Sequence, residues 1–291
     1  MNALGSTIAD RYILDSLLGE GAMGAVYAGR RLADGLPVAV KILLPEIAAN
    51  EEMRKRFVRE ATALSTLQHP NIIGVLEFGE IASSCFLVME RLHGESLGTY
   101  TEEHPVTPET ALVIADQMLA GLGFAHMHGV LHRDVKPDNL FVATQADGSR
   151  IIKLLDFGLV KFVDREAWND QSTLTAQGTI LGSPPYMPPE QIFGQTVDAR
   201  ADVYSAGVVL FELLTGIWPF MAEEVSEIFR AHALDPVPKL ETARATLRVV
   251  PELDALIAKA MEKSPDQRFA DARAMRTALQ QLPRPAAWLI G

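Results

Sequence analysis

The residues best suited to chemistry lie close together in one polar segment and just after one apolar run. Asp134, Lys136 and Asn139 fall within the segment 132–140, and Asp156 follows the apolar run 151–155. Phosphoryl transfer needs a base for a hydroxyl, a cation for phosphate charge and oxygen ligands for a metal ion, because its catalysis is mostly positioning and charge neutralisation. These residues supply each of those groups. The alternative is a polar turn after a helix, and the offsets between the three loop residues argue against it.

A glycine-rich turn precedes these residues in the chain. Gly19, Gly21 and Gly24 match the pattern Gly-x-Gly-x-x-Gly, which alone is a weak signal. A dinucleotide-binding turn opens a helix, whereas here the run 26–28 and the turn at 34–35 predict a hairpin. Glycine has no Cβ, so its backbone N–H group can approach a triphosphate closely. A hairpin over a nucleotide is one interpretation, and a tight turn without a ligand is the other.

Glu60 lies in the apolar face of a helix predicted over 51–68. The apolar residues that share this face are Met53, Phe57, Leu64 and Leu67. An unpaired carboxylate among them would cost on the order of several kcal/mol, so Glu60 needs a cation. Lys41, at the end of the strand predicted over 38–40, is one candidate and would aim its ammonium at phosphate oxygens. A surface pair with Arg56 is the other, and the sequence favours neither.

Composition limits the class of protein. The 291 residues carry a net charge of −11, which argues against a nucleic-acid binder because such proteins present a basic face. The single cysteine, Cys85, cannot form an intrachain disulfide and suits a reducing compartment. The first residues lack the pattern of a signal peptide, and we expect no membrane segment in this chain. A cytoplasmic location is therefore predicted, with the cytoplasmic portion of a longer membrane-anchored protein as the alternative.

The chain changes character near Gly94. Before it, short apolar runs separated by turns predict strands at 11–14, 26–28, 38–41, 76–78 and 86–89. After it the pattern is mainly helical: Thr107 and Pro108 predict the start of a long apolar helix that reaches His128. The segment 202–215 is apolar nearly all round, which is typical of a helix at the centre of a large lobe.

Taken in order, these residues resemble the eukaryotic-type (Hanks-type) serine/threonine protein kinases of bacteria. The motifs of the resemblance are the glycine turn and the segments 38–41, 69–72, 132–140, 156–158, 186–191 and 202–207, together with Arg268. The resemblance implies an α+β fold of two lobes, a small β-rich lobe with one long helix and a larger, mainly helical lobe. The kinase domain would span 11–282, divided into a small lobe 11–89, a hinge 90–94 and a large lobe 95–282. Residues 1–10 would be an N-terminal extension and 283–291 a C-terminal tail.

The resemblance implies that the protein transfers the γ-phosphate of ATP to serine or threonine residues of protein substrates. The catalytic residues would be Asp134, Lys136, Lys41 and Glu60, and the metal ligands Asn139 and Asp156, with Mg²⁺ as the ion and Mn²⁺ as a substitute. Asp134 would accept the hydroxyl proton, Lys136 would contact the γ-phosphate, and Lys41, held by Glu60, would contact the α- and β-phosphates. The ATP-binding residues would be Leu18, Gly19, Glu20, Gly21, Ala22, Met23, Gly24, Ala25, Val26, Ala39, Lys41, Met89, Glu90, Leu92 and Phe141.

The same resemblance implies several internal contacts. Leu64, Leu76, His132 and Phe157 would stack into a spine anchored by Asp202, and Glu190 would pair with Arg268. The segment 159–186 resembles an activation loop, in which Thr173, Thr175 or Thr179 would be autophosphorylated and Arg133 would receive the phosphate. A solvated polar loop without a modification is the alternative for this segment.

Departures from the family pattern and rival functions complete the prediction. Pro188 stands where alanine or serine is usual, and Ser183 replaces a threonine while keeping its hydroxyl.

The main rival function is a nucleotide-binding pseudokinase scaffold, against which the complete set of catalytic residues argues. A small-molecule kinase is the second rival, and the segment 182–190, which resembles a peptide platform, argues against it. The resemblance leaves a homodimer open.

Overall fold

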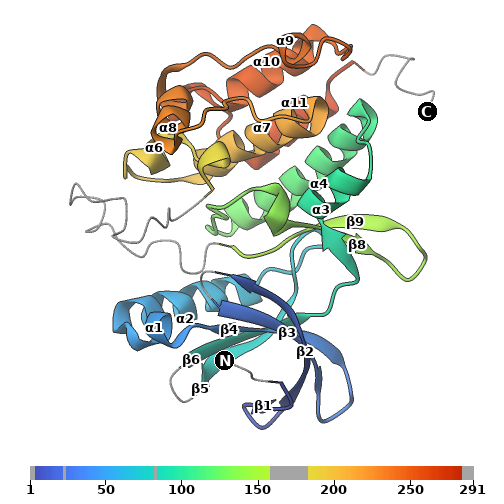
Figure 1. Cartoon of the computed structure of the whole chain (residues 1–291), viewed down its shortest axis with the longest axis vertical. Helices are drawn as coiled ribbons and strands as arrows, with labels where there is room; N and C mark the ends of the chain where they lie inside the picture. The colour runs from blue at the N-terminus through green and yellow to red at the C-terminus, as the bar shows by residue number, and fades with distance from the viewer. Residues whose placement is uncertain (1–3, 22–23, 82–83, 158–182, 284–291) are drawn as a thin grey trace.

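The computed structural model describes residues 4–21, 24–81, 84–157 and 183–283. They form two lobes, a small one built on a β-sheet and a larger one that is mainly helical (Figure 1). The small lobe contains the N-terminal part of the chain, and the catalytic segment 132–140 belongs to the larger lobe. The two-lobed α+β fold is therefore confirmed.

The small lobe is an antiparallel sheet with the strand order β1-β2-β3-β4-β6-β5. Its strands are β1 (Thr7–Ile8), β2 (Tyr12–Gly21), β3 (Gly24–Arg31), β4 (Pro37–Leu43), β5 (Val75–Ile81) and β6 (Ser84–Glu90). Alternate residues of β4 enter different apolar clusters: Val38 and Val40 lie in one, and Ala39 and Leu43 in the other. Side chains along a strand alternate between the two faces of the sheet, so the central strand is buried on both.

The long helix of the small lobe covers one face of this sheet. α2 (Glu51–Ser65) begins at Asn50, whose side chain accepts hydrogen bonds from the backbone N–H groups of Glu52 and Met53. Its buried residues, Phe57, Ala61 and Leu64, follow the helical spacing that the sequence predicts. A shorter helix, α1 (Pro45–Ala49), precedes it and contacts β6. The face that carries Glu60 is thus directed toward the sheet and the neighbouring lobe.

Part of the predicted N-terminal extension joins the sheet. β1 pairs antiparallel with β2, with Thr7 opposite Ile13 and Ile8 opposite Tyr12. The side chain of Ile8 is 5% exposed and packs in the same cluster as Tyr12. Residues 7–8 are therefore part of the sheet of the small lobe, and Ile8 is part of its core.

The larger lobe combines helices with a small antiparallel sheet and three short 3₁₀ turns. The helices are α3 (Leu97–Glu103), α4 (Pro108–Met127), α6 (Pro189–Ile192), α7 (Ala199–Thr215), α8 (Val225–Leu234), α9 (Leu240–Ala243), α10 (Pro251–Ala260) and α11 (Ala272–Gln280). The strands are β7 (Gly94–Ser96), β8 (Leu140–Thr144) and β9 (Arg150–Leu154), in the order β7-β8-β9. The turns are η1 (Pro137–Asn139), η2 (Pro184–Tyr186) and η3 (Pro265–Gln267). Because η1 leads directly into β8, the small sheet fixes one end of the catalytic segment.

Helix α7 lies at the centre of the larger lobe and packs against α4, α10 and α11 (Figure 1). Asp198 caps its start by accepting a hydrogen bond from the backbone N–H of Arg200, and it ends at Gly216, which has a φ of 80° in the left-handed region. Nearly every residue between these caps is buried. The prediction of a helix at the centre of the large lobe over 202–215 is confirmed.

Helix α4 is the one helix in the described ranges that is long and apolar enough to cross a membrane. A buried core helix passes the same test of length and composition, so this finding does not contradict the expectation of no membrane segment. The most apolar window of α4 is 56% buried within the protein. Packing against α7 and α11 thus accounts for most of its apolar character.

Candidate active site

The structure brings the predicted residues of the catalytic segment together. The Nδ2 of Asn139 donates hydrogen bonds to the backbone carbonyl and to Oδ2 of Asp134, at 2.8 and 2.7 Å. The Nζ of Lys136 donates to Oγ of Ser183 at 2.8 Å and lies 3.9 Å from Oδ2 of Asp134. The carboxylate of Asp134 therefore accepts a hydrogen bond from the amide of Asn139, and the ammonium of Lys136 lies nearby.

A buried aspartate on α7 shapes the backbone of this segment. Asp202 is 1% exposed and accepts hydrogen bonds from the backbone N–H groups of His132 and Arg133, at 2.8 and 2.7 Å. Arg133 has a φ of 64°, a left-handed conformation that costs on the order of 1–3 kcal/mol for a residue other than glycine. The bonds to Asp202 offset this strain. The predicted anchoring role of Asp202 is confirmed.

A histidine that the sequence analysis did not identify supports the anchor. The Nε2 of His126, at the end of α4, lies 2.8 Å from Oδ2 of Asp202. Burial alone would raise the pKa of Asp202, but the bond with His126 and the neighbouring donors hold that pKa below its usual value. Asp202 is therefore ionised, and its negative charge strengthens the bonds to the strained backbone.

Lys41 and Asp156 form an ion pair across the two lobes. The Nζ of Lys41, on β4, donates to Oδ1 of Asp156 at 2.6 Å. Asp156 has a φ of 46°, so its backbone is also left-handed. Burial opposes ionisation of Asp156, but the charge and hydrogen bond of Lys41 outweigh it and keep its pKa below the usual value. An ionised, partly exposed carboxylate is thus held beside the lysine.

Glu60 does not pair with Lys41 in this structure, and that prediction is wrong. Its Oε1 accepts a hydrogen bond from Nη1 of Arg133 at 3.1 Å. The surface alternative is wrong as well, because Arg56 pairs with Glu52 one turn earlier on the same helix. Burial raises the pKa of Glu60 in spite of Arg133, as expected for a carboxylate on the inner face of α2.

The predicted spine is correct except at one position. His132 and Phe157 are buried with ring centroids 4.7 Å apart, and Leu64 is 1% exposed. Leu76, in contrast, is 44% exposed. The preceding residue, Val75, packs against the apolar clusters of both lobes. The pairing of β5 with β6 shifts register between Val75 and Glu77, so Leu76 lies at an irregularity of the strand and its side chain is left exposed.

The predicted adenine pocket gathers on the small lobe and the connection to the larger one. Val26, Ala39, Met89 and Leu92 pack in one apolar cluster. Phe141, the predicted floor of the pocket, lies on β8 in the larger lobe and is partly buried. This arrangement places apolar surface from both lobes around the connection.

The glycines of the β2–β3 turn serve different purposes. A Cβ at Gly24 would lie 2.0 Å from the carbonyl oxygen of Ile42, so this glycine is required by the fold. A Cβ at Gly19 or Gly21 would meet nothing within 4 Å. Those two glycines therefore have an open face on which a ligand could lie, together with Leu18, Glu20 and Ala25 of the same hairpin. Ala22 and Met23 lie outside the described residues.

A buried lysine on β9 bonds Glu90, the first residue of the segment that joins the two lobes. The Nζ of Lys153 donates to Oε1 of Glu90 at 2.6 Å and to the carbonyl of Ile72 at 3.3 Å. The same Oε1 accepts a hydrogen bond from the backbone N–H of Gly74 at 2.8 Å. This network fixes the orientation of Glu90. Sequence reasoning missed it because the groups come from three segments that are far apart in the chain.

The predicted pair of Glu190 and Arg268 is present and fully buried. Two hydrogen bonds of 2.7 and 2.8 Å join the guanidinium to the carboxylate, and the side chains are 0% and 3% exposed. The guanidinium also lies over the ring of Tyr204, 4.8 Å from its centroid. The pair holds α6, at the end of the peptide-facing segment, against the C-terminal part of the lobe.

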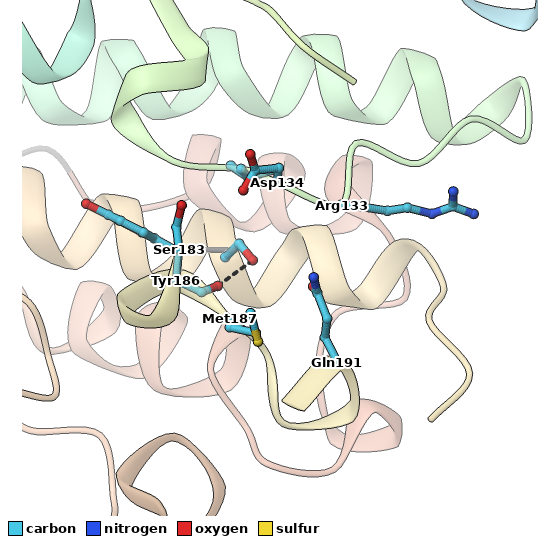
Figure 2. Close-up of a pocket in the computed structure, with 8 residues that line it drawn as sticks. Arg133, Asp134, Ser183, Tyr186, Met187 and Gln191 are labelled. Carbon is cyan, nitrogen blue, oxygen red and sulfur yellow. Dashed lines mark hydrogen bonds between the residues drawn. The ribbon is translucent and has the colours of Figure 1, made fainter. Parts of the chain in front are cut away.

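A small, partly open hollow lies between the catalytic segment and η2 (Figure 2). It is lined by Arg133, Asp134, Val135, Ser183, Tyr186, Met187, Gln191 and Ser205. The Oγ of Ser205 donates to the carbonyl of Tyr186 at 2.8 Å, which ties η2 to α7 below the hollow. Asp134 and Ser183 thus face the same small space. The predicted phosphorylation candidates Thr173, Thr175 and Thr179 lie outside the described residues.

Comparisons with known proteins agree with this geometry. Residues 12–281 match the protein kinase domain family. The chain is 36% identical to serine/threonine-protein kinase pkn3 of Myxococcus xanthus over 97% of its own length and 51% of that protein. It is 37% identical to PknB of Mycolicibacterium smegmatis, over 94% of this chain and 43% of PknB. The chain thus spans about half, or less, of these relatives.

A solved structure gives the same result for the fold. The crystal structure of the PknI kinase domain of Mycobacterium tuberculosis is 28% identical, with a TM-score of 0.75, and the match covers 97% of this chain and 99% of that one. The chain therefore belongs to the protein kinase domain family, as a Hanks-type bacterial kinase domain.

Proposed function

We propose that this protein transfers the γ-phosphate of ATP to serine or threonine residues of protein substrates in bacterial signalling. The observation that carries the proposal is the group formed by Asp134, Lys136 and Asn139, joined to Ser183 by the 2.8 Å bond from Lys136. The relatives named above are serine/threonine-protein kinases, which supports the same activity.

The contacts support a proposed role for each side chain of this group. The bond from Asn139 fixes Asp134, whose carboxylate orients the substrate hydroxyl and accepts its proton as the oxygen attacks phosphorus. Lys136 neutralises charge that develops on the transferred phosphoryl group. Its bond to Ser183 places it between the catalytic segment and the substrate-facing segment.

The residues present also fit a divalent metal ion. Nδ2 of Asn139 is engaged by Asp134, so its carbonyl oxygen is the end directed elsewhere, and Asp156 offers an ionised, partly exposed carboxylate. Mg²⁺ prefers oxygen ligands of this kind, so Asn139 and Asp156 would hold it, with Mn²⁺ as a substitute. The ion would neutralise phosphate charge when ATP is bound.

The nucleotide itself would lie between the lobes. Lys41 would contact the phosphates of ATP, and its position beside the proposed metal ligand Asp156 supports this role. The residues proposed to enclose adenine are Val26, Ala39, Met89, Glu90, Leu92 and Phe141, beneath the hairpin 18–26. Homodimer formation and a cytoplasmic location stay predictions.

Incubation of the protein with Mg-ATP, followed by intact-mass measurement and phosphopeptide mapping, tests the proposal. We expect phosphate on the wild type and on a generic basic protein. Asp134→Asn should lose at least about a thousandfold in rate while its affinity for ATP stays within about twofold, because Asp134 acts on the hydroxyl. Nucleotide binding without any phosphate transfer by the wild type would instead support the pseudokinase scaffold.

Autophosphorylation in the segment 159–186 is proposed as the activating step. The receiving group would be Arg133, which in this structure is occupied by Glu60. A phosphate carries more charge than a carboxylate and would compete for the same guanidinium. Full activity in a protein with Thr173→Ala, Thr175→Ala and Thr179→Ala together would contradict this proposal.

A further inference from the structure

His232, near the end of α8, is a fully buried histidine that takes no part in the chemistry described above. Its Nδ1 lies 2.8 Å from the hydroxyl of Tyr204 on α7, and its ring meets the edge of Phe220 with centroids 5.0 Å apart. Its Nε2 has no hydrogen bond of normal geometry within the described part of the chain. Buried polar atoms usually have a partner, so this nitrogen requires an explanation.

The surroundings of the ring determine where its proton lies. Burial, and then the nearby charge of Lys263, lowers the pKa of His232 to about 4, so the ring is neutral at pH 7. Burial also raises the pKa of Tyr204, which therefore keeps its hydroxyl proton. The short contact is then a bond from the Tyr204 hydroxyl to Nδ1, and the proton of the neutral ring is on Nε2.

The backbone group that interacts with this imidazole is the carbonyl of Pro185. Because Nδ1 accepts a hydrogen bond from Tyr204, the Nε2–H group is the one that can donate to this carbonyl. Two cations lie near the imidazole. Arg268 lies over the ring of Tyr204 and pairs with Glu190. Lys263 lies over the ring of Phe220, 4.4 Å from its centroid. Neither cation can accept the proton of Nε2.

Pro185 belongs to the segment that joins the catalytic residues to the proposed peptide surface. Two consecutive prolines in η2 have no backbone N–H, so the segment is held through its carbonyls and side chains. Ser205 already fixes the carbonyl of Tyr186. The residue just before η2 is Ser183, which bonds Lys136. A shift of η2 would therefore move Ser183 relative to the catalytic segment.

We propose that His232 is a positioning residue for the protein substrate, which donates from Nε2 to the carbonyl of Pro185 and holds η2 against α8 when a peptide occupies the adjoining surface. The carbonyl of Pro185 already interacts with the imidazole in the present structure, so the proposed bond needs only a small adjustment of η2 or of the ring. Contacts of α8 with both η2 and α6 give this bond a short path to the substrate-facing segment. The kinetic part of this inference rests on the proposed function.

Two substitutions in the full chain separate positioning from a merely structural role. His232→Asn keeps an acceptor near Nδ1 for Tyr204 and loses the donor at Nε2, whereas His232→Gln places an amide N–H near Nε2. We expect His232→Asn to raise the KM for a peptide substrate about tenfold, with kcat and the KM for ATP within about twofold. His232→Gln should return the peptide KM to near the wild-type value. A merely structural role would lower kcat and the melting temperature of both variants together.

Amide hydrogen exchange provides a readout that does not depend on catalysis. The backbone N–H groups of Tyr186 and Met187 bond the carbonyls of Ser183 and Pro184, at 3.0 and 3.3 Å. These amides should exchange faster in His232→Asn than in the wild type, and at the wild-type rate in His232→Gln. Such a difference in a protein that transfers no phosphate would support the positioning role and refute the proposed function. Equal peptide KM or equal exchange rates in the two variants and the wild type would overturn the positioning role.

Discussion

The Oε1 of Glu60 lies 3.1 Å from Nη1 of Arg133, while Lys41 is 2.6 Å from Asp156. Each acidic residue thus has a basic partner, but the pairs differ from the Lys41–Glu60 pair that the resemblance implies. Glu60 is on α2 in the small lobe and Arg133 directly precedes the proposed base. The structure therefore shows a state in which the arginine proposed to receive a phosphate is occupied by the carboxylate proposed to serve the nucleotide.

Glu60→Gln tests whether Glu60 changes partner during the reaction. The amide keeps an acceptor for Arg133, so the melting temperature should change by no more than a few degrees. It cannot form an ion pair with Lys41, so we expect kcat to fall about a hundredfold in steady-state assays of peptide phosphorylation. Glu52→Gln is the matched control, because Glu52 pairs with Arg56 on the exposed side of the same helix. Wild-type kcat in Glu60→Gln would show that Glu60 serves only the resting state.

The buried pair of Glu190 and Arg268 should dominate the stability of the larger lobe. Arg268→Ala leaves a carboxylate that is 3% exposed without its cation, and breaking such a pair costs about 3–5 kcal/mol. It also removes the contact with the ring of Tyr204. Urea denaturation should show this loss as a lower midpoint.

Arg276→Ala is the control for this measurement. Arg276 pairs with Asp116 in similar geometry, but the side chains are 37% and 31% exposed. Partly exposed pairs contribute about 0–1 kcal/mol, so this variant should lose little stability. Equal losses in the two variants would mean that burial of the Glu190–Arg268 pair has no special effect.

The parts of the fold that the sequence predicts well are those specified by local pattern. The catalytic segment was identified because Asp134, Lys136 and Asn139 are close in sequence, and the structure keeps them within hydrogen-bonding distance of one another or of Ser183. Helix α7 was identified because its residues are apolar on every side. In both cases the information needed lies within one element.

The errors concern choices that only tertiary structure makes. Lys41, Arg56 and Arg133 are all cations that Glu60 could meet, and the orientation of α2 relative to the larger lobe selects Arg133. The spine required the conformation of β5 at Leu76, where the pairing with β6 shifts register and leaves the side chain exposed. Neither the rotation of a helix nor an irregularity in a short edge strand is encoded in a local motif.

The low pKa of His232 predicts a specific dependence of stability on pH. Burial lowers this pKa from 6.5 to about 4, so between these values the unfolded chain binds a proton that the folded protein does not. The free energy of unfolding should therefore fall as the pH is lowered from 6.5 to 4, by at most about 3 kcal/mol from this residue. His132, whose pKa is also lowered by burial, acts in the same direction.

Urea denaturation of the wild type and of His232→Gln across this pH range isolates the contribution of His232. Glutamine cannot take up a proton, so the curve of unfolding free energy against pH should be less steep for the variant. The aspartates with lowered pKa values lose their contributions only at more acidic pH and are common to both proteins; they are Asp34, Asp147, Asp156, Asp198, Asp202 and Asp271. The difference between the two curves therefore reports the buried imidazole alone. Parallel curves would mean that His232 is protonated in the folded protein or reaches water, and the assignment of its proton to Nε2 would fail with it.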